Sequence, residues 1–292
     1  MTEPATEAVT GRSVPEQQVA STSPFFQAGV QFSQNRNYPE ALIAFSKAIQ
    51  DDHASANAYA NRCLMFLQLH HPHEAIADCS TAISLKPDHL NAHLNRGLAF
   101  YRKGDAAAAI ADFSTVLTQH PYSVQAHYNR GLAEAVLGQH QSAMDDFNQA
   151  LRHATGAEGA VLATIYSDRG ITRLQQGDTA GAIADLSLSL RLNDASAEAY
   201  FNRAHAYQHQ GAIAQARHDF SAAIAHDPNF AEAYFNRGML HYRLGHHERA
   251  IADLQTATHL FQQQGDILAH HRAHQITQQI IQHISADSSA VG

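Results

Sequence analysis

The chain has 292 residues, a formal net charge of -8 and a hydrophobic content of 45%. The apolar content is sufficient for a folded core, whereas the net negative charge argues against a nucleic-acid partner, which needs clustered Lys and Arg. No apolar run approaches the roughly 20 residues that cross a bilayer, and no charged segment followed by an apolar one marks a secretion signal. Composition therefore favours a cytoplasmic protein without membrane insertion, built as two compact domains or as one long array.

The N-terminal segment, residues 1–21, consists mainly of Thr, Glu, Ser, Pro and Gln with isolated valines. Such a composition cannot build a core, so we expect a disordered tail, with docking of the tail to a partner as the alternative. The first helix should begin after Ser23, a capping residue, with Pro24 in its first turn.

From Thr22 onward the chain is a series of paired helices. Apolar residues recur at helical spacing on either side of a break, which is explicit at Gly104-Asp105 and Gly177-Asp178. Glycine ends a helix in a left-handed conformation and Asp caps the next one. Three of the pairs close with a proline, at Pro87, Pro121 and Pro228.

An Asn-Arg-Gly motif or a close variant recurs six times in this region. Successive arginines are 34 residues apart, except for a step of 39 between Arg130 and Arg169. A fixed period of this length is typical of a stack of identical supersecondary units.

The small residues of each repeat identify a known family. A glycine in the first helix pairs with an alanine in the second, as in Gly97 with Ala109 and Gly131 with Ala143, followed by an aromatic residue and a closing proline. This pattern resembles the tetratricopeptide repeat (TPR) family; Sel1-like and pentatricopeptide repeats are rivals with longer periods. The resemblance implies an all-α, right-handed α-α superhelix of seven TPR helical hairpins plus a C-terminal capping helix, without strands.

One junction is longer than the others by five residues, which fall between residues 155 and 162. We interpret it as a break between TPR units 1–4, residues 22–157, and TPR units 5–7, residues 158–264. Residues 265–285 should form a capping helix, since an array needs a last helix with one polar face. Residues 286–292 should form a second disordered tail.

Each of the six arginines is followed sixteen residues later by an aspartate. The pairs are Arg62 with Asp78, Arg96 with Asp112, Arg130 with Asp146, Arg169 with Asp185, Arg203 with Asp219 and Arg237 with Asp253. We predict structural ion pairs between the two helices of one repeat, because pairing between successive repeats would leave Arg62 and Asp253 alone. An arginine row that binds anions is the functional alternative.

The residue before each arginine indicates a binding groove. A helix turns about 200° over two residues, so if the glycine faces its own repeat, the asparagine two places earlier faces the concave side of a TPR superhelix. Residues three and seven places further on share that stripe. The candidate peptide-binding residues are Asn61, Leu64, Asn95, Leu98, Arg102, Asn129, Leu132, Asp168, Asn202, His205, Asn236, Met239 and Arg243.

Asparagine is a poor residue inside a helix, so its repetition needs a reason. A carboxamide both donates to and accepts from a peptide backbone, and the TPR arrays of O-GlcNAc transferases are similar in carrying such an Asn ladder. The alternative is that the amides only bond neighbouring helices. The carboxylate clamp of chaperone-binding TPR domains needs a Lys beside the Asn, and none stands there.

The histidines and cysteines offer weaker signals. His205 with His209, and His270 with His274, share helix faces, but no third ligand or His-Glu-x-x-His motif completes a metal site. We therefore expect solvated or groove histidines, able to make binding pH-sensitive. Cys63 and Cys79 fill core positions. We interpret them as inert thiols, with a redox switch as the alternative.

The sequence shows no Gly-rich phosphate loop, nucleophile triad or metal set. We therefore expect a non-enzymatic adaptor without cofactors or metals, which binds a peptide or helix of a partner protein and takes part in assembly of a larger complex. The alternative is a regulatory subunit of an enzyme whose catalytic domain lies on another chain.

Overall fold

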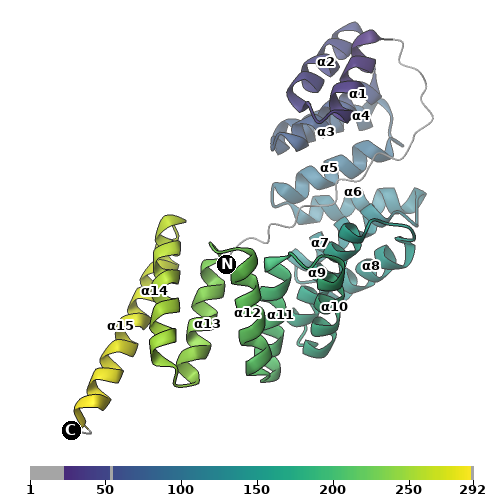
Figure 1. The fold of residues 1–292 in the computed structure, drawn as a ribbon. Coiled ribbons are helices and arrows are strands. Elements are labelled where there is room, and N and C mark those ends of the chain that lie inside the picture. Colours follow the sequence, from purple (N-terminus) through teal and green to yellow (C-terminus); the bar gives the residue numbers. More distant parts are fainter. Residues whose placement is uncertain (1–22, 53–54, 291–292) are drawn as a thin grey trace. The chain divides into compact units, whose positions relative to one another are not determined.

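The computed structural model describes residues 23–52 and 55–290, and within these two ranges every regular element is a helix and none is a strand (Figure 1). The predicted all-α class is confirmed, and the predicted N-terminal tail, residues 1–21, lies outside the described residues. The helices are α1 (Pro24–Gln34), α2 (Tyr38–Asp51), α3 (Ala56–Gln68), α4 (Pro72–Leu85), α5 (Leu90–Arg102), α6 (Ala106–Gln119), α7 (Val124–Val136), α8 (His140–His153), α9 (Gly159–Gln175), α10 (Thr179–Leu192), α11 (Ala197–Gln210), α12 (Ile213–His226), α13 (Ala231–Arg243), α14 (His247–Gln263) and α15 (Ile267–Ala290).

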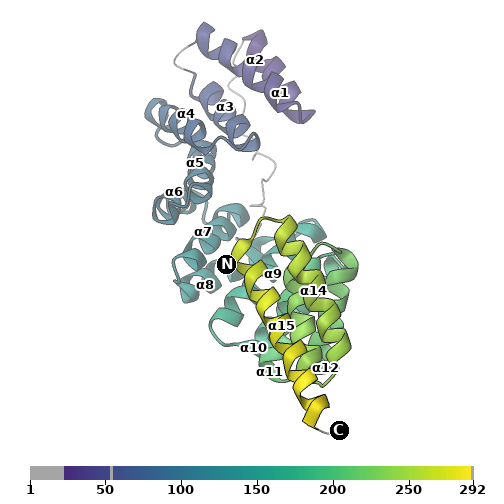
Figure 2. The ribbon, with the colours of Figure 1, turned by 90° about the vertical axis from the view of Figure 1, so that its left-hand side faces the viewer.

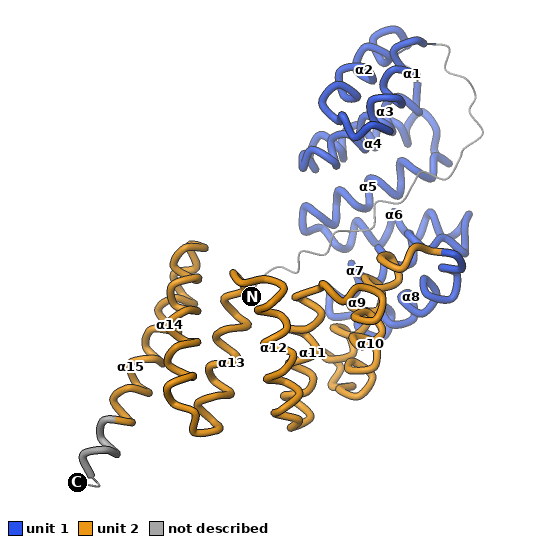
Figure 3. The backbone as a smooth tube through the Cα atoms, in the orientation of Figure 1, with its two compact units in different colours: residues 1–156 blue, residues 157–292 orange. Residues whose placement is uncertain are grey.

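The chain divides into two compact units, residues 1–156 and residues 157–292 (Figure 3). Unit 1 contains α1–α8 and unit 2 contains α9–α15. In both units the helices pair as hairpins, from α1 with α2 to α13 with α14, and each hairpin packs on the next one of its unit. The first helices of successive hairpins also contact each other. Examples are α3 with α5 in unit 1 and α9 with α11 in unit 2.

The last helix, α15, packs against α14 (Figure 2). Asp266 caps it, since the Asp266 side chain accepts a hydrogen bond from the backbone N–H of Ala269 at 2.9 Å. The helix continues to Ala290, past the end that the sequence predicts at residue 285. Residues 286–290 therefore belong to this helix, whereas the sequence assigns them to the tail. None of the described helices is long and apolar enough to cross a membrane.

The turns inside the hairpins need a left-handed residue. Gly104 (φ 88°) and Gly177 (φ 81°) supply it, as the sequence predicts. Arg36 (φ 58°) and His70 (φ 61°) stand at the equivalent place in the first two hairpins. These two non-glycine residues keep the register of the turn at the cost of a strained backbone.

Glycine and phenylalanine fit together where the two helices of a hairpin approach. A Cβ on Gly97 would lie 2.7 Å from the ring of Phe113, and a Cβ on Gly29 would lie 2.6 Å from the ring of Phe45. In these two hairpins a larger residue than glycine would have to displace the ring, whereas the sixth hairpin has Ala204 before Phe220. The Phe45 and Phe113 side chains are fully buried.

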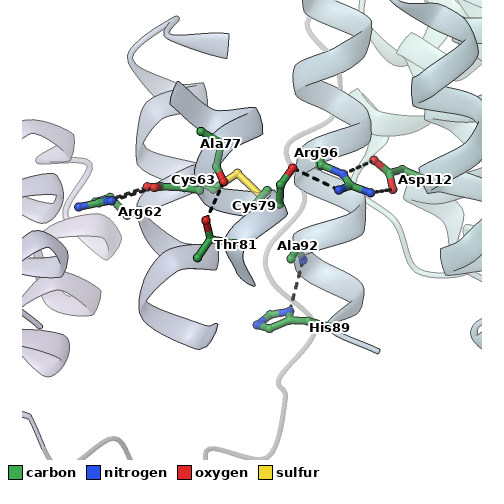
Figure 4. The surroundings of a disulfide bond; sticks show 11 residues. Arg62, Cys63, Ala77, Cys79, Thr81, His89, Ala92, Arg96 and Asp112 are labelled. Atoms are coloured by element: carbon green, nitrogen blue, oxygen red, sulfur yellow. Dashed lines mark hydrogen bonds and ion pairs between the residues drawn. A yellow bond between two sulfur atoms is a disulfide. The ribbon is translucent and has the colours of Figure 1, made fainter. Parts of the chain in front are cut away.

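The second hairpin replaces this glycine and phenylalanine with Cys63 and Cys79, which form a disulfide between α3 and α4 (Figure 4). Their Cα atoms are 5.5 Å apart and both side chains are fully buried. The interpretation of these residues as inert free thiols is therefore wrong. Spacing alone did not distinguish two contacting thiols from a bond between them.

Candidate functional site

The six repeated arginines and aspartates meet inside their own hairpins. In each pair the guanidinium Nε and Nη2 donate to the two carboxylate oxygens at distances between 2.6 and 3.0 Å. All six aspartates are buried and the arginines are partly buried. Such bidentate, charge-assisted pairs are both strong and geometrically specific.

The same arginines also join successive hairpins. In five of them, the guanidinium Nη1 donates a hydrogen bond of 3.0 to 3.2 Å to a serine on the second helix of the preceding hairpin. The five are Arg62, Arg96, Arg130, Arg203 and Arg237. The serines are Ser46, Ser80, Ser114, Ser187 and Ser221. Sequence reasoning missed them, although a serine stands sixteen residues before five of the six arginines.

The residue three places before each arginine covers the ion pair. A tyrosine ring lies 5.5 to 5.6 Å from the guanidinium carbon in four hairpins, a cation–π contact that involves Tyr59, Tyr166, Tyr200 and Tyr234. His93 and His127 take this place in the third and fourth hairpins. The His127 ring lies between Asp146 Oδ1, at 2.7 Å from Nδ1, and the Pro121 carbonyl oxygen, at 2.9 Å from Nε2. Both ring nitrogens therefore face an oxygen that can only accept a hydrogen bond.

The fourth hairpin carries a buried acid beside this ion pair. Glu134 on α7 occupies the position at which Phe66 and Phe100 cover the arginine of earlier hairpins. It is 8% exposed, and its Oε2 has no hydrogen-bond partner. Burial, together with the nearby negative charge of Asp146, raises the pKa of the Glu134 carboxyl to about 7.

Glu134 should make the fourth hairpin less stable as the pH rises. The pKa of the Glu134 carboxyl is about 7 in the folded chain and about 4.3 in an unfolded one, so folding favours the protonated carboxyl. This contribution to the free energy of unfolding is fully present below pH ~4.3 and is lost as the pH rises to about 7. We expect wild type to lose about 2 kcal/mol relative to Glu134→Gln over this window. Urea denaturation of both proteins at pH 4.5, 6 and 8 measures the difference, and parallel pH curves would contradict the assignment.

In unit 1 the asparagines before the arginines have different environments. Asn61 Nδ2 donates to the carbonyl oxygen of Asn57 in its own helix at 2.8 Å, so its donor is already used. Asn129 is 3% exposed, and its buried Oδ1 has no partner. Asn95 is partly exposed and makes no side-chain hydrogen bond within the described residues. Asn95 is therefore the amide of unit 1 that is best placed to bind a ligand.

The other candidate residues of unit 1 are less open than the helical stripe suggests. Leu98 and Leu132 are 4% and 6% exposed and belong to the core, while Leu64 is half-buried. Arg102 is exposed, but its Nη1 donates to the carbonyl oxygen of Leu67 at 2.7 Å, which ties α5 to α3. The predicted apolar row is therefore largely covered by the neighbouring hairpin.

In unit 2 the candidates also separate by environment. Asp168 is buried, Met239 is half-buried and Arg243 is exposed. Asn236 Nδ2 donates to the carbonyl oxygen of Glu232 at 2.8 Å. His205 is half-buried and contacts two phenylalanine rings edge-on, and burial lowers its pKa, which disfavours the charged imidazolium.

Asn202 is the candidate that lines a pocket. The pocket has a volume of about 150 Å³ and is lined by Ile171, Leu174 and Gln175 of α9, Leu186 of α10 and Asn202 of α11. The Asn202 side chain is partly exposed and makes no hydrogen bond within the described residues. An apolar hollow with one unpaired amide is the usual composition of a small binding site. No group of three or more potential metal ligands gathers in the described part of the chain.

Comparisons with known proteins agree with this architecture. Residues 64–124, 104–158 and 202–265 match the sequence profile of the tetratricopeptide repeat, and together they span more than half of the chain. No curated protein matches the chain in sequence.

Several solved structures are similar in fold. A tetratricopeptide repeat protein from Parabacteroides merdae ATCC 43184 gives a TM-score of 0.62 at 19% identity, over 81% of this chain and 91% of that one. PilF from Pseudomonas aeruginosa gives 0.63 at 17% identity, over 76% and 96%. The APC/C hetero-tetramer Cut9–Hcn1 gives 0.63 at 19% identity, over 72% of this chain and 41% of that one. Identities this low show the fold alone.

Proposed function

Because this chain belongs to the tetratricopeptide repeat family, whose members serve as protein-interaction scaffolds, we propose that it binds an extended segment of a partner protein along the first helices of its hairpins. The observation that supports this proposal is that each unit, taken by itself, has an amide without a hydrogen bond in the described residues: Asn95 in unit 1 and Asn202 in unit 2. An amide at the surface of a helix offers one acceptor and two donors, which match the alternating groups of an extended backbone.

The chemistry of the ion pairs favours a structural role for them over anion binding. Both carboxylate oxygens of each aspartate already accept from its arginine, and in five pairs the remaining guanidinium nitrogen reaches a serine. An arginine so engaged has little capacity left for a phosphate or carboxylate ligand. The proposed ligand is therefore a peptide segment of a protein, without a nucleic-acid or cofactor component, and the proposed role is assembly of a larger complex.

Removing the two unpaired amides should weaken partner binding without unfolding the chain. Loss of one hydrogen bond at each site costs about 0.5 to 1.5 kcal/mol, so Asn95→Ala with Asn202→Ala should reduce affinity by about five-fold to 150-fold. The measurement is calorimetric titration of a segment recovered by pull-down, with thermal melts of each protein. The matched control is Asn61→Ala with Asn236→Ala, because those amides already donate to their own helices and should matter less. Unchanged affinity of the folded first variant would place the partner elsewhere.

The second candidate function is regulation of an enzyme carried on another chain. The same pull-down distinguishes it, because an enzyme recovered with this protein should change its kcat or KM when the protein is added back. A binding segment that leaves the activity of its parent protein unchanged favours the scaffold.

A further inference from the structure

The pocket between α9, α10 and α11 lies at a hairpin that carries leucine where four other hairpins carry phenylalanine; the seventh hairpin also carries a leucine there, Leu254. Phe113, Phe147 and Phe220 fill the space beside the small residue of their hairpins and are fully buried. The fifth hairpin has Leu186 at this position, packed against Gly170, where a Cβ would lie 2.9 Å from Leu186 Cγ. Leucine fills less space than phenylalanine, and Leu186 lines the pocket that remains.

The size and lining of the pocket fit one aliphatic side chain. A cavity of about 150 Å³ lined by aliphatic residues holds a group as large as benzene. Ile171, Leu174 and Leu186 supply the apolar walls. A Leu, Ile or Met side chain therefore fits, whereas a charged group would lose its hydration without a counter-charge.

Asn202 supplies the polar edge of the same pocket. Its amide has no hydrogen bond within the described residues, whereas the equivalent Asn236 donates to Glu232 at 2.8 Å. A side chain that enters the pocket brings its own backbone N–H and C=O to the rim. The Asn202 amide can bond both groups, which favours a peptide over a lipid or hydrocarbon ligand.

The charge next to the pocket is negative. Glu198 lies one helical turn before Asn202 on α11, hence on the same side of the helix. It has no hydrogen bond or ion partner within the described residues, and burial raises the pKa of its carboxyl. Arg203, the nearest cation in sequence, is held by Asp219. On the other side of Asn202, burial of His205 disfavours its charged form, and His209 is exposed. A ligand that brings a Lys or Arg therefore supplies the missing counter-charge.

We propose that this pocket is the anchor site for an extended peptide segment that carries an aliphatic residue with a Lys or Arg close to it in sequence. The aliphatic side chain fills the pocket, the backbone bonds to Asn202, and the basic side chain pairs with Glu198. This assignment rests on the proposed function and names the chemistry of the segment that unit 2 selects.

The test is selection of phage-displayed random decapeptides on the immobilised full-length chain, followed by fluorescence titration of the best synthetic peptide. We expect enrichment of sequences in which an aliphatic residue stands within three positions of a Lys or Arg. Leu186→Phe puts a phenylalanine ring against Gly170, as Phe113 and Phe147 already lie against Gly97 and Gly131. The variant should therefore fold with its pocket filled, and it should bind the peptide at least ten-fold more weakly. Asn202→Ala should weaken binding about two-fold to twelve-fold, and the matched control Asn236→Ala should not.

The charge arm of the test uses Glu198→Lys, which should reverse the preference from a basic to an acidic peptide of otherwise identical sequence. Peptides that bind Leu186→Phe and wild type equally would overturn the anchor site while the proposed function stands. Enriched peptides without the aliphatic and basic pair would also overturn it. Failure to select any binding peptide would contradict the peptide-binding function itself.

Discussion

Arg237→Ala should lower the free energy of unfolding by about 3 kcal/mol, and by more than Arg96→Ala does. Asp253 is 8% exposed, and Arg237 provides both of its short hydrogen bonds, so the mutation leaves a buried carboxylate without a counter-charge. In Arg96→Ala the equivalent Asp112 keeps the hydrogen bond from His93 at 2.9 Å. The remaining hydrogen bond keeps one carboxylate oxygen of Asp112 paired, which is why the smaller loss is expected there.

A double-mutant cycle tests the pairing directly. Asp253→Ala added to Arg237→Ala should recover much of the lost stability, because it removes the lone buried charge. Urea denaturation gives the global change, and hydrogen exchange of α13 and α14 gives the local one, since a stack of repeats can open locally. Additive losses in the cycle, or equal losses for Arg237→Ala and Arg96→Ala, would show that the ion pair is not the source of the effect.

Reduction of the Cys63–Cys79 disulfide should destabilise the second hairpin by about 3 kcal/mol. The bond closes a loop with a sequence separation of 16 residues, and a loop near this length restricts the unfolded chain by about that amount in the entropic account. Thermal melts with and without dithiothreitol, combined with a thiol assay, measure the change. An unchanged melt in a protein whose thiols are shown to be free would contradict it.

The chain supplies its own control for the disulfide. Cys63→Gly with Cys79→Phe installs the pair that Gly97 and Phe113 form in the next hairpin, so this variant should be insensitive to reductant and close to the oxidised protein in stability. Cys63→Ala with Cys79→Ala lacks both the bond and the ring, and should melt lowest. Equal melting of the two variants would show that the Gly–Phe contact does not substitute for the bond.

The disulfide is also relevant to the cellular compartment of the protein. Composition predicts a cytoplasmic location, whereas buried disulfides persist mainly in oxidising compartments. We propose a cytoplasmic location. The test is to trap the thiols in intact cells and measure whether Cys63 and Cys79 are reduced. Finding both cysteines oxidised would exclude a reducing compartment such as the cytoplasm.

The sequence by itself determined the features that repeat with a fixed period. A step of 34 residues assigns each position to one face of one helix, so the hairpins, the Gly–Phe contacts and the meeting of Arg96 with Asp112 inside one hairpin follow from spacing. The capping of α15 by Asp266 follows from local chemistry in the same way.

Only the tertiary structure decided what lies between neighbouring hairpins. The angle and distance at which one hairpin packs on the next determine which side chains of the inner stripe stay open, and spacing does not contain that information. Leu98 and Asn129 are therefore buried, whereas Asn95 on the same predicted stripe stays partly exposed. For the same reason the pocket beside Leu186 depends on how successive hairpins pack together.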